Sequence, residues 1–295
     1  MVSLPLWSTL KHTVQECIDD DVPRLSAALA YYAVFSLAPL LLISIAVAGS
    51  IFGADAVRGE LDDELRRSLG PSGAFAVQDM LAGARRPETN FWVSIAGIVM
   101  LLFGAAGVFG QLQAALNQVW DVKLKPGRSI RNMAKDRFVS FTMVLSTGFL
   151  LLTSMILTAV LHGVSEYANR ILTLPATLWS AISGIGSFAV ITLLFAAIFK
   201  VLPDVRLRWR HVWVGAMFTS ALFVIGKTAM GWYLGREAIA SSYGSAGSLA
   251  LVLLWVYYSS IILLFGAEFT QVWAKAQGDN IKPNRHAMLV KTESR

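Results

Sequence analysis

The sequence predicts an all-α integral membrane protein with about six transmembrane helices and both termini in the cytoplasm. Of the 295 residues, 55% are hydrophobic and only 15% are charged, whereas charged residues make up roughly a quarter of an ordinary soluble domain. The apolar residues gather in runs of about 20, the length that a helix needs to cross a hydrocarbon layer of roughly 30 Å. Such runs form helices because backbone polar groups must be paired with each other inside lipid.

The N-terminal segment precedes the first long apolar run. Residues 4–18 place four sites on one helical stripe: Leu6, Leu10, Val14 and Cys17 with Ile18. This pattern predicts a short amphipathic helix on the cytoplasmic membrane surface, where Trp7 suits the interface. Asp19, Asp20 and Asp21 interrupt the region in which a cleavable signal peptide would have its apolar core.

The membrane domain is expected to cover residues 1–275, followed by a disordered cytoplasmic tail over 276–295. The six spans are expected at about 27–52, 91–113, 138–161, 178–202, 212–235 and 247–272. Pro39 lies inside the first span and removes a backbone hydrogen bond, which predicts a helix kink. The loop over 53–90 carries an apolar helical stripe on each side of Gly70-Pro71, and these stripes predict a small helical hairpin on the periplasmic side.

The distribution of Lys and Arg predicts the orientation. Seventeen of the 25 lie in the N-terminal segment, the second loop, the fourth loop and the tail, and seven lie in the other three loops. Cytoplasmic loops of membrane proteins retain Lys and Arg, so both termini are expected in the cytoplasm of a multi-pass protein of the bacterial inner membrane. The same rule accounts for the net charge of +6 without a nucleic-acid partner.

Motifs of soluble enzymes do not occur in the sequence. There is no phosphate-binding P-loop, no G-x-S-x-G, no H-E-x-x-H and no pair of cysteines. The four histidines are far apart along the chain, at span ends or in tails, which does not suit a metal site. We therefore expect no enzymatic activity, no cofactor and no metal.

Lys227 is one of two ionisable residues expected at membrane depth, where such residues are costly and are candidates for function. On one interpretation it lies in a polar cavity that holds an anionic or polar part of a substrate. Candidate path residues are Trp255, Tyr257, Tyr258, Ser183, Ser154 and, in the small polar segment 241–248, Tyr243. On the other, the lysine extends to the periplasmic side and pairs with a carboxylate such as Glu237, which would argue against a substrate site.

Glu268 is the second such residue, and it lies near the cytoplasmic end of the last span. Its depth differs from that of Lys227 by about 17 Å at 1.5 Å per residue, so the two are not expected to pair. On one interpretation Glu268 forms an ion pair that clamps helix ends. On the other it is a proton- or cation-coupling carboxylate at a cytoplasmic gate. Candidate neighbours are Arg24, Arg137 and Asn117.

A resemblance to a known family rests on motifs spread over residues 5–275. They are Arg24 to Tyr32 with Ser36-Leu37-Ala38-Pro39, Ala115-Leu116-Asn117 with Trp120, Leu202-Pro203-Asp204, Tyr243-Gly244-Ser245, Leu254-Trp255 and Gly266-Ala267-Glu268. In these motifs the chain resembles the YihY/BrkB family of bacterial inner-membrane proteins. The resemblance implies a transporter, since members are described as such and are linked to serum resistance or to export of a lipopolysaccharide precursor. It also carries an old ribonuclease BN label, which no cluster of metal-binding residues here supports.

Three function hypotheses follow. The first is a gradient-driven or passive transporter or exporter of a lipid-type or amphiphilic envelope component or a small solute. The alternative is a non-transporting scaffold or accessory subunit of envelope machinery, and the third is an intramembrane enzyme. Membrane lipids and an unidentified substrate are the expected partners, and the glycine-rich faces would suit a homo-oligomer as well as a single bundle.

Overall fold

The computed structural model describes residues 6–84, 107–125, 176–234, 247–279, 281–284 and 287–290. These residues are mostly helical. The named helices are α1 (Leu6–Asp19), α2 (Val22–Phe52), α3 (Ala54–Ala84), α6 (Ala176–Val201), α7 (Trp209–Leu234) and α9 (Gly247–Ala276), and a further helix covers 107–119. Four short strands are β1 (Val122–Leu124), β2 (Val205–Arg206), β3 (Lys282–Pro283) and β4 (Ala287–Leu289).

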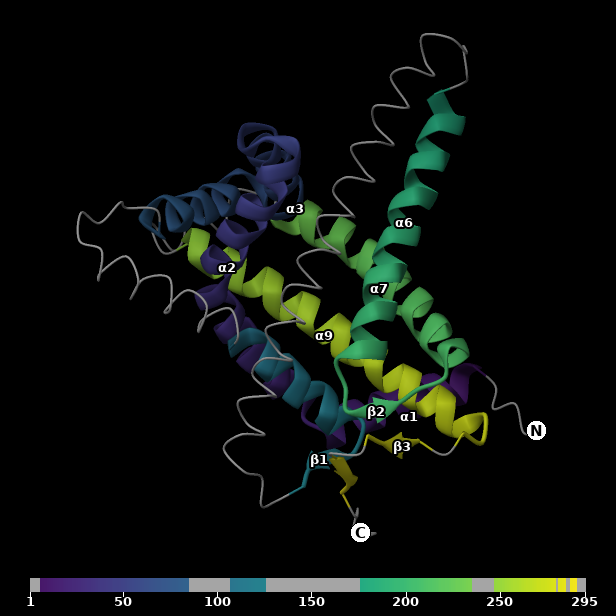
Figure 1. Ribbon diagram of the computed structural model, residues 1–295. Coiled ribbons are helices and arrows are strands. Elements are labelled where there is room, and N and C mark those ends of the chain that lie inside the picture. Colours follow the sequence, from purple (N-terminus) through teal and green to yellow (C-terminus); the bar gives the residue numbers. More distant parts are fainter. Residues whose placement is uncertain are drawn as a thin grey trace.

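Helix α9 lies at the centre of the described bundle. It packs against α1, α2, α3 and α7, and α6 packs on α7 (Figure 1). The helix α1, the strands and both termini lie at one end of the bundle, which we call the strand end (Figure 1). Helix α3 lies at the other, which we call the hairpin end. The largest apolar core is at the strand end and joins α1, α2, the helix over 107–119, α6, α7 and α9.

Three described helices are long and apolar enough to cross a membrane. The stretches are Gly184–Val201, Trp209–Met230 and Leu249–Ala276, and they confirm the last three predicted spans as membrane-length apolar helices. Helix α2 covers the predicted first span and runs through Pro39, where the kink stays a prediction. Most of the predicted spans 91–113 and 138–161 lies outside the described residues.

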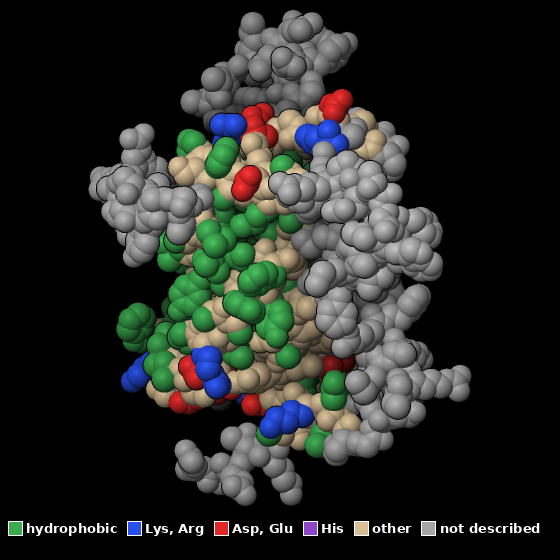
Figure 2. All heavy atoms as spheres, turned by 90° about the vertical axis from the view of Figure 1, so that its left-hand side faces the viewer, with side chains coloured by type: hydrophobic (Ala, Val, Ile, Leu, Met, Phe, Trp, Pro, Cys, Tyr) green, Lys and Arg blue, Asp and Glu red, His purple; other side chains and the backbone are tan. Residues whose placement is uncertain are grey.

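The surface has the distribution of side chains that a membrane requires. On the face shown in Figure 2, hydrophobic side chains cover the middle of the described part, and Lys, Arg, Asp and Glu gather toward its two ends. Exposed apolar side chains on the membrane-length helices include Ile185, Leu193, Met217, Ile225 and Leu254. Large apolar patches of this kind mark contact with lipid or another protein.

Helices α7 and α9 interlock through two glycines and two threonines. A Cβ atom added at Gly215 would overlap the side chain of Thr270, and one added at Gly266 would overlap the side chain of Thr219. Each threonine hydroxyl donates a hydrogen bond to the glycine carbonyl four residues earlier in its own helix, at 2.7 Å for Thr219 and 2.6 Å for Thr270. The hydroxyls are therefore satisfied within each helix, and the glycines allow the two backbones to approach closely.

The predicted helical hairpin is present in α3. Its helical backbone is interrupted at Gly70, which adopts a positive φ of 73°, a conformation that glycine accepts without strain. Val57 and Leu69 of the first arm are buried, as is Val77 of the second. Asp62 and Gln78 join the two arms by a hydrogen bond. Phe75, also on the second arm, is 68% exposed.

Helix α1 packs on the bundle mainly through small side chains and leaves part of its apolar stripe exposed. Thr9, Thr13 and Cys17 are buried, while Val14 and Ile18 of the predicted stripe are exposed together with Trp7. Small threonine side chains allow α1 to lie close to α9, with which it is in contact. The exposed apolar residues remain available to an interface with lipid, as an amphipathic surface helix requires.

The C-terminal tail corrects the expectation of disorder after residue 275. Strand β3 pairs with β2, and β4 pairs with β1, both antiparallel. The backbone of Asn284 also donates to the carbonyl of Asp204 at 2.8 Å. The described parts of the tail, 281–284 and 287–290, are paired with loops far away in the sequence, so their own short segments carry no strong signal of this order.

Candidate functional site

Lys227 pairs with a carboxylate at the hairpin end. Its Nζ lies 2.7 Å from Oε1 of Glu64 in α3, with 36% of the lysine side chain and 48% of the glutamate side chain exposed. Pairing of Lys227 with a carboxylate is what the second interpretation of this lysine expects, and the partner is Glu64. The carboxylate named there, Glu237, lies outside the described residues. Lys227 is therefore placed away from Glu268, as the depths predicted, and we do not carry it forward as a substrate residue.

The aromatic residues predicted beside Lys227 take part in packing between α7 and α9. The ring of Trp255 meets that of Phe223 edge to face, with centroids 6.4 Å apart. The Tyr258 side chain lies where a Cβ atom at Gly226 would be. Tyr257 is half-buried. Ser154, Tyr243 and the Ser183 side chain lie outside the described residues, so the predicted path residues stay a prediction.

Glu268 is the most unusual polar residue of the described bundle. It lies in α9 with 0% of its surface exposed, and neither carboxylate oxygen has a hydrogen-bond partner among the described groups. An ionised carboxylate in such a place costs several kcal/mol unless it is paired. The expected clamp by a cation is not found among the described residues, because Arg24 pairs with the exposed Asp21 at 2.9 Å. Arg137 lies outside the described part.

Asp20 is the acidic neighbour of Glu268. It lies in the turn between α1 and α2, close enough to Glu268 for each carboxyl group to affect the other's charge, but no hydrogen bond joins the two groups by geometry. Burial raises the pKa of Asp20, and the charges of Asp121 and Glu16 act in the same direction, while the nearby Glu268 carboxyl and the charge of Lys275 lower it. The two carboxyl groups come from segments 248 positions apart, and α1 packing on α9 brings them together.

Three polar contacts fix the surroundings of this pair. The Gln118 side chain donates to the carbonyl of Asp20 at 2.8 Å. The Asp121 carboxylate accepts a hydrogen bond from Gln271 at 3.1 Å and lies 3.3 Å from the ammonium of Lys275. Glu268, Gln271 and Lys275 are spaced by three and four residues, so they share one face of α9.

Asn117 lies on the same helix as Gln118 but binds elsewhere. Its side chain donates to the carboxylate of Asp204 at 2.9 Å and accepts from the Asp204 backbone N–H at 2.8 Å. This double contact ties the helix over 107–119 to the turn that follows α6. Asn117 therefore positions the helix that carries Gln118, and its side-chain hydrogen bonds within the described residues go to Asp204.

The pair can hold and release a proton. Two ionised carboxylates in one buried space repel each other, so a proton on one of them is favoured. Protonation leaves one negative charge in the pair at most, which Lys275 faces from the rim. Loss of that proton would leave two negative charges between α1, α2 and α9.

Cys17 lies beside the pair and gives a chemical probe of it. Burial, and then the charges of Glu268, Asp20 and Glu16, raise the pKa of its thiol to about 12 from an ordinary 9.0. The reactive thiolate is thus about a thousand-fold rarer than for an ordinary thiol. We expect maleimide labelling of Cys17 at pH 8 to be slow in the folded protein and fast after denaturation. Labelling at similar rates in both states would contradict the burial of this cluster.

Sequence reasoning found Glu268 but missed its partner. Asp20 belongs to the run Asp19-Asp20-Asp21, which the sequence presents as a solvated segment before the first span. The one feature that could have pointed to Asp20 is its position in the sequence. It lies directly before an apolar helix, on the cytoplasmic side where Glu268 was expected. Asp121 and Gln271 have no comparable signal, because each is an ordinary polar residue at a span end.

Comparison with known proteins agrees with the resemblance. The family model described as "Virulence factor BrkB" matches residues 13–289. A UPF0761 membrane protein of Pseudomonas paraeruginosa is 29% identical over 262 residues, which cover 85% of this chain and 59% of that protein. One of Alteromonas mediterranea is 26% identical over 259 residues, with 87% and 84% covered. The chain spans about three fifths of the length of the Pseudomonas relatives. No solved structure matches.

Proposed function

The chain belongs to the BrkB family of membrane proteins, and we propose that it is an inner-membrane transporter whose Asp20–Glu268 pair carries a coupling proton. The observation that carries the proposal is the burial of Glu268 beside Asp20 without a hydrogen-bond donor among the described groups. Buried carboxyl groups at membrane depth are the usual components of proton relays in transporters. A gradient-driven mechanism follows, in which the pair is protonated in one arrangement of α1, α2 and α9 and deprotonated in another.

The proposed topology has six spans with the strand end in the cytoplasm. Most of the described Lys and Arg residues lie in the segments of the strand end, including Lys123, Lys200, Arg206, Arg208 and Arg210. Lysine and arginine favour the cytoplasmic side. Both termini, which lie at that end in Figure 1, would then be cytoplasmic, and the hairpin of α3 would be periplasmic.

A lipid-type or amphiphilic envelope component is the cargo that the surface chemistry favours. At the hairpin end, a cavity of about 310 Å³ is lined by Ile45, Leu61, Leu65 and Leu81 next to Arg58, Asp62 and Gln78. Apolar walls beside a few charged groups suit a molecule with an acyl or polyprenyl part and a polar head. We propose transport rather than catalysis for this protein, since a buried carboxyl pair at membrane depth is suited to holding and releasing a proton.

Flux in proteoliposomes tests the proposal. Gradients of cations, of small solutes and of a labelled lipid are imposed in turn on vesicles that contain the wild type, Glu268→Gln or Lys227→Gln. Glutamine keeps the size of Glu268 and donates a hydrogen bond, but it cannot release a proton. We expect wild-type flux of one cargo, its loss in Glu268→Gln and its retention in Lys227→Gln, because that lysine pairs with Glu64 at 2.7 Å. No flux in any arm, or equal flux in all three proteins, would overturn the proposal.

A further inference from the structure

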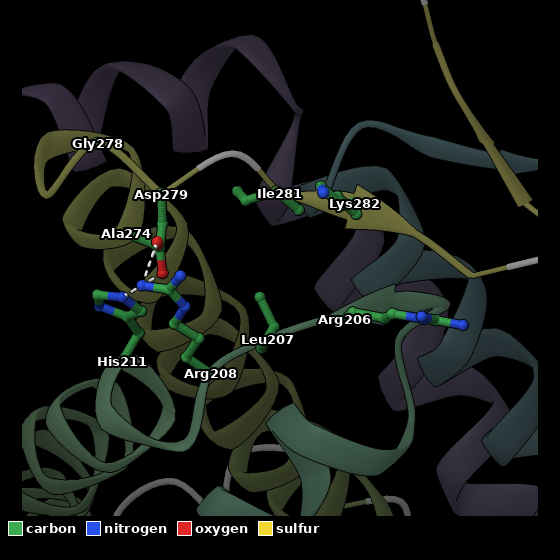
Figure 3. Close-up of a pocket in the computed structure, with 9 residues that line it drawn as sticks. All are labelled: Arg206, Leu207, Arg208, His211, Ala274, Gly278, Asp279, Ile281 and Lys282. Atoms are coloured by element: carbon green, nitrogen blue, oxygen red, sulfur yellow. Dashed lines mark hydrogen bonds and ion pairs between the residues drawn. The ribbon is translucent and has the colours of Figure 1, made fainter.

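A second cavity lies at the strand end, on the side of α7 where that helix begins. Its volume is about 400 Å³, and its walls come from β2, the first turn of α7, the end of α9 and β3. Figure 3 shows His211 and Arg208 reaching toward Asp279, with Leu207 between them and the strand that carries Lys282. The tail thus forms one wall of this cavity.

The cavity carries an excess of positive charge. Arg206, Arg208 and Lys282 line it, against the single carboxylate of Asp279. That carboxylate is already shared, at 2.9 Å from Arg208 and 2.6 Å from His211. Arg206 and Lys282 form no ion pair with any residue of the described segments, and both are exposed. At least two cations of the cavity are therefore free to meet an anion.

The two free cations are neighbours by the strand register. Arg206 pairs with Lys282 across the β2–β3 ladder. Like charges directly opposite each other weaken a strand pair, and an anion between them would remove that cost. In Figure 3 the Arg206 side chain extends away from the His211–Asp279 pair and from Lys282, so these two exposed side chains would have to turn toward an anion that they share. The first turn of α7 adds the positive end of its helix dipole.

Exposed tryptophans place the mouth of the cavity at the depth of lipid headgroups. Trp209 and Trp213 begin α7 with 52% and 40% of their surfaces exposed, and their ring centroids are 6.4 Å apart. The ammonium of Lys200 lies 5.3 Å from the Trp209 ring centroid. Indole rings gather at membrane interfaces, and basic pockets on the cytoplasmic side of membrane helices bind anionic headgroups.

We propose that this cavity binds the phosphate group of an anionic lipid headgroup, held by Arg206 and Lys282. The phosphate chemistry follows from the two free cations, and the lipid source follows from the exposed indoles beside them. Lipid bound here would hold the C-terminal tail against α7. The site is separate from the Asp20–Glu268 pair, and its occupancy does not depend on whether the protein transports anything.

Native mass spectrometry of the detergent-purified protein tests the site. Phosphatidylglycerol and phosphatidylcholine are titrated separately into the wild type, the double variant Arg206→Gln/Lys282→Gln and the matched control Lys11→Gln/Lys123→Gln. The control removes two exposed cations of the strand end that do not line the cavity. A fourth protein, Arg206→Lys/Lys282→Arg, keeps both charges.

Wild type and control are expected to bind phosphatidylglycerol more tightly than phosphatidylcholine. The glutamine variant should need at least about five times more phosphatidylglycerol for half-saturation, which is the effect of losing one such cation near a membrane surface. The charge-keeping variant should bind as the wild type does. Equal phosphatidylglycerol binding by all proteins would overturn the site. Binding of inorganic phosphate or glycerol phosphate that displaces the lipid would overturn the assignment to a lipid and leave a soluble phosphate compound as the ligand.

Discussion

Gly266→Ala is expected to lower the free energy of unfolding by about 1–3 kcal/mol, the usual cost of forcing an extra group into a packed contact. The added Cβ would overlap the Cβ, Oγ1 and Cγ2 atoms of Thr219. The Thr219 side chain cannot move aside easily, because its hydroxyl donates a hydrogen bond to the carbonyl of Gly215 at 2.7 Å. The helices α7 and α9 would have to separate, which disturbs the contact that places Glu268. Unfolding by denaturant in detergent measures the change.

Two further variants make this expectation specific. Gly184→Ala is the matched control, since a Cβ atom there meets open space, and its effect should stay within about 0.5 kcal/mol. The second is the double variant Gly266→Ala/Thr219→Gly. It lacks all three atoms that the new Cβ would meet, so it should recover part of the stability that Gly266→Ala alone loses. An unchanged stability of Gly266→Ala, or no recovery in the double variant, would show that the interlock does not set the α7–α9 distance.

Glu268→Gln is expected to weaken the pH dependence of stability while it abolishes transport. The raised pKa of Asp20 means that the folded state holds this proton more tightly than the unfolded chain does. The stability that this proton contributes is complete below the ordinary Asp pKa of 3.8 and is lost as the pH rises through the higher pKa of the folded state. Glutamine keeps a hydrogen-bond donor beside Asp20 at every pH and removes one negative charge.

Thermal unfolding in detergent, followed from below the ordinary Asp pKa of 3.8 upward in pH, measures this second expectation. The wild type should lose stability as the pH rises through the folded-state pKa of Asp20, and Glu268→Gln should lose less. Asp279→Asn is a suitable comparison, because that carboxylate lies at the separate basic cavity and pairs with Arg208 and His211. If Glu268→Gln follows the wild-type pH profile, the two carboxyl groups do not share a titrating proton.

The apolar spans could be predicted from sequence because lipid imposes a length and a composition on each of them. Pro175 and Pro203 predict where α6 begins and ends, and the helix does lie between them, from Ala176 to Val201. The hairpin followed from Gly70, whose positive φ of 73° breaks the helix. The depths of Lys227 and Glu268 could likewise be estimated by counting residues, and this count correctly separated them.

The partners of these residues could not be predicted, because each partner comes from a distant segment. Glu64 of the first loop meets Lys227 only through the way that α3 lies on α7. Asp20 meets Glu268 because α1 packs on α9 with Thr9, Thr13 and Cys17 buried, while Val14 and Ile18 stay exposed. The tail was misjudged for the same reason, since β3 and β4 are too short to show a pattern without β2 and β1.

The packing of α7 and α9 and the proton of the Asp20–Glu268 pair are related, because both involve α9. The glycine–threonine interlock holds α9 at a fixed distance, and α1 covers the end of α9 where Glu268 is buried. If both carboxyl groups of the pair were ionised, their repulsion would act on α1 and α2, which flank Asp20, rather than on α7. We therefore expect α1 to be the element that moves when the pair releases its proton.

Proton movement during transport is the most direct test of this account. Proteoliposomes loaded with a pH-sensitive dye report the internal pH while the cargo found in the flux panel moves down its gradient. The account predicts a change of internal pH that accompanies cargo flux in the wild type and the disappearance of both in Glu268→Gln. Cargo flux that proceeds in the wild type without any proton movement, or a pH change that persists in Glu268→Gln, would contradict it.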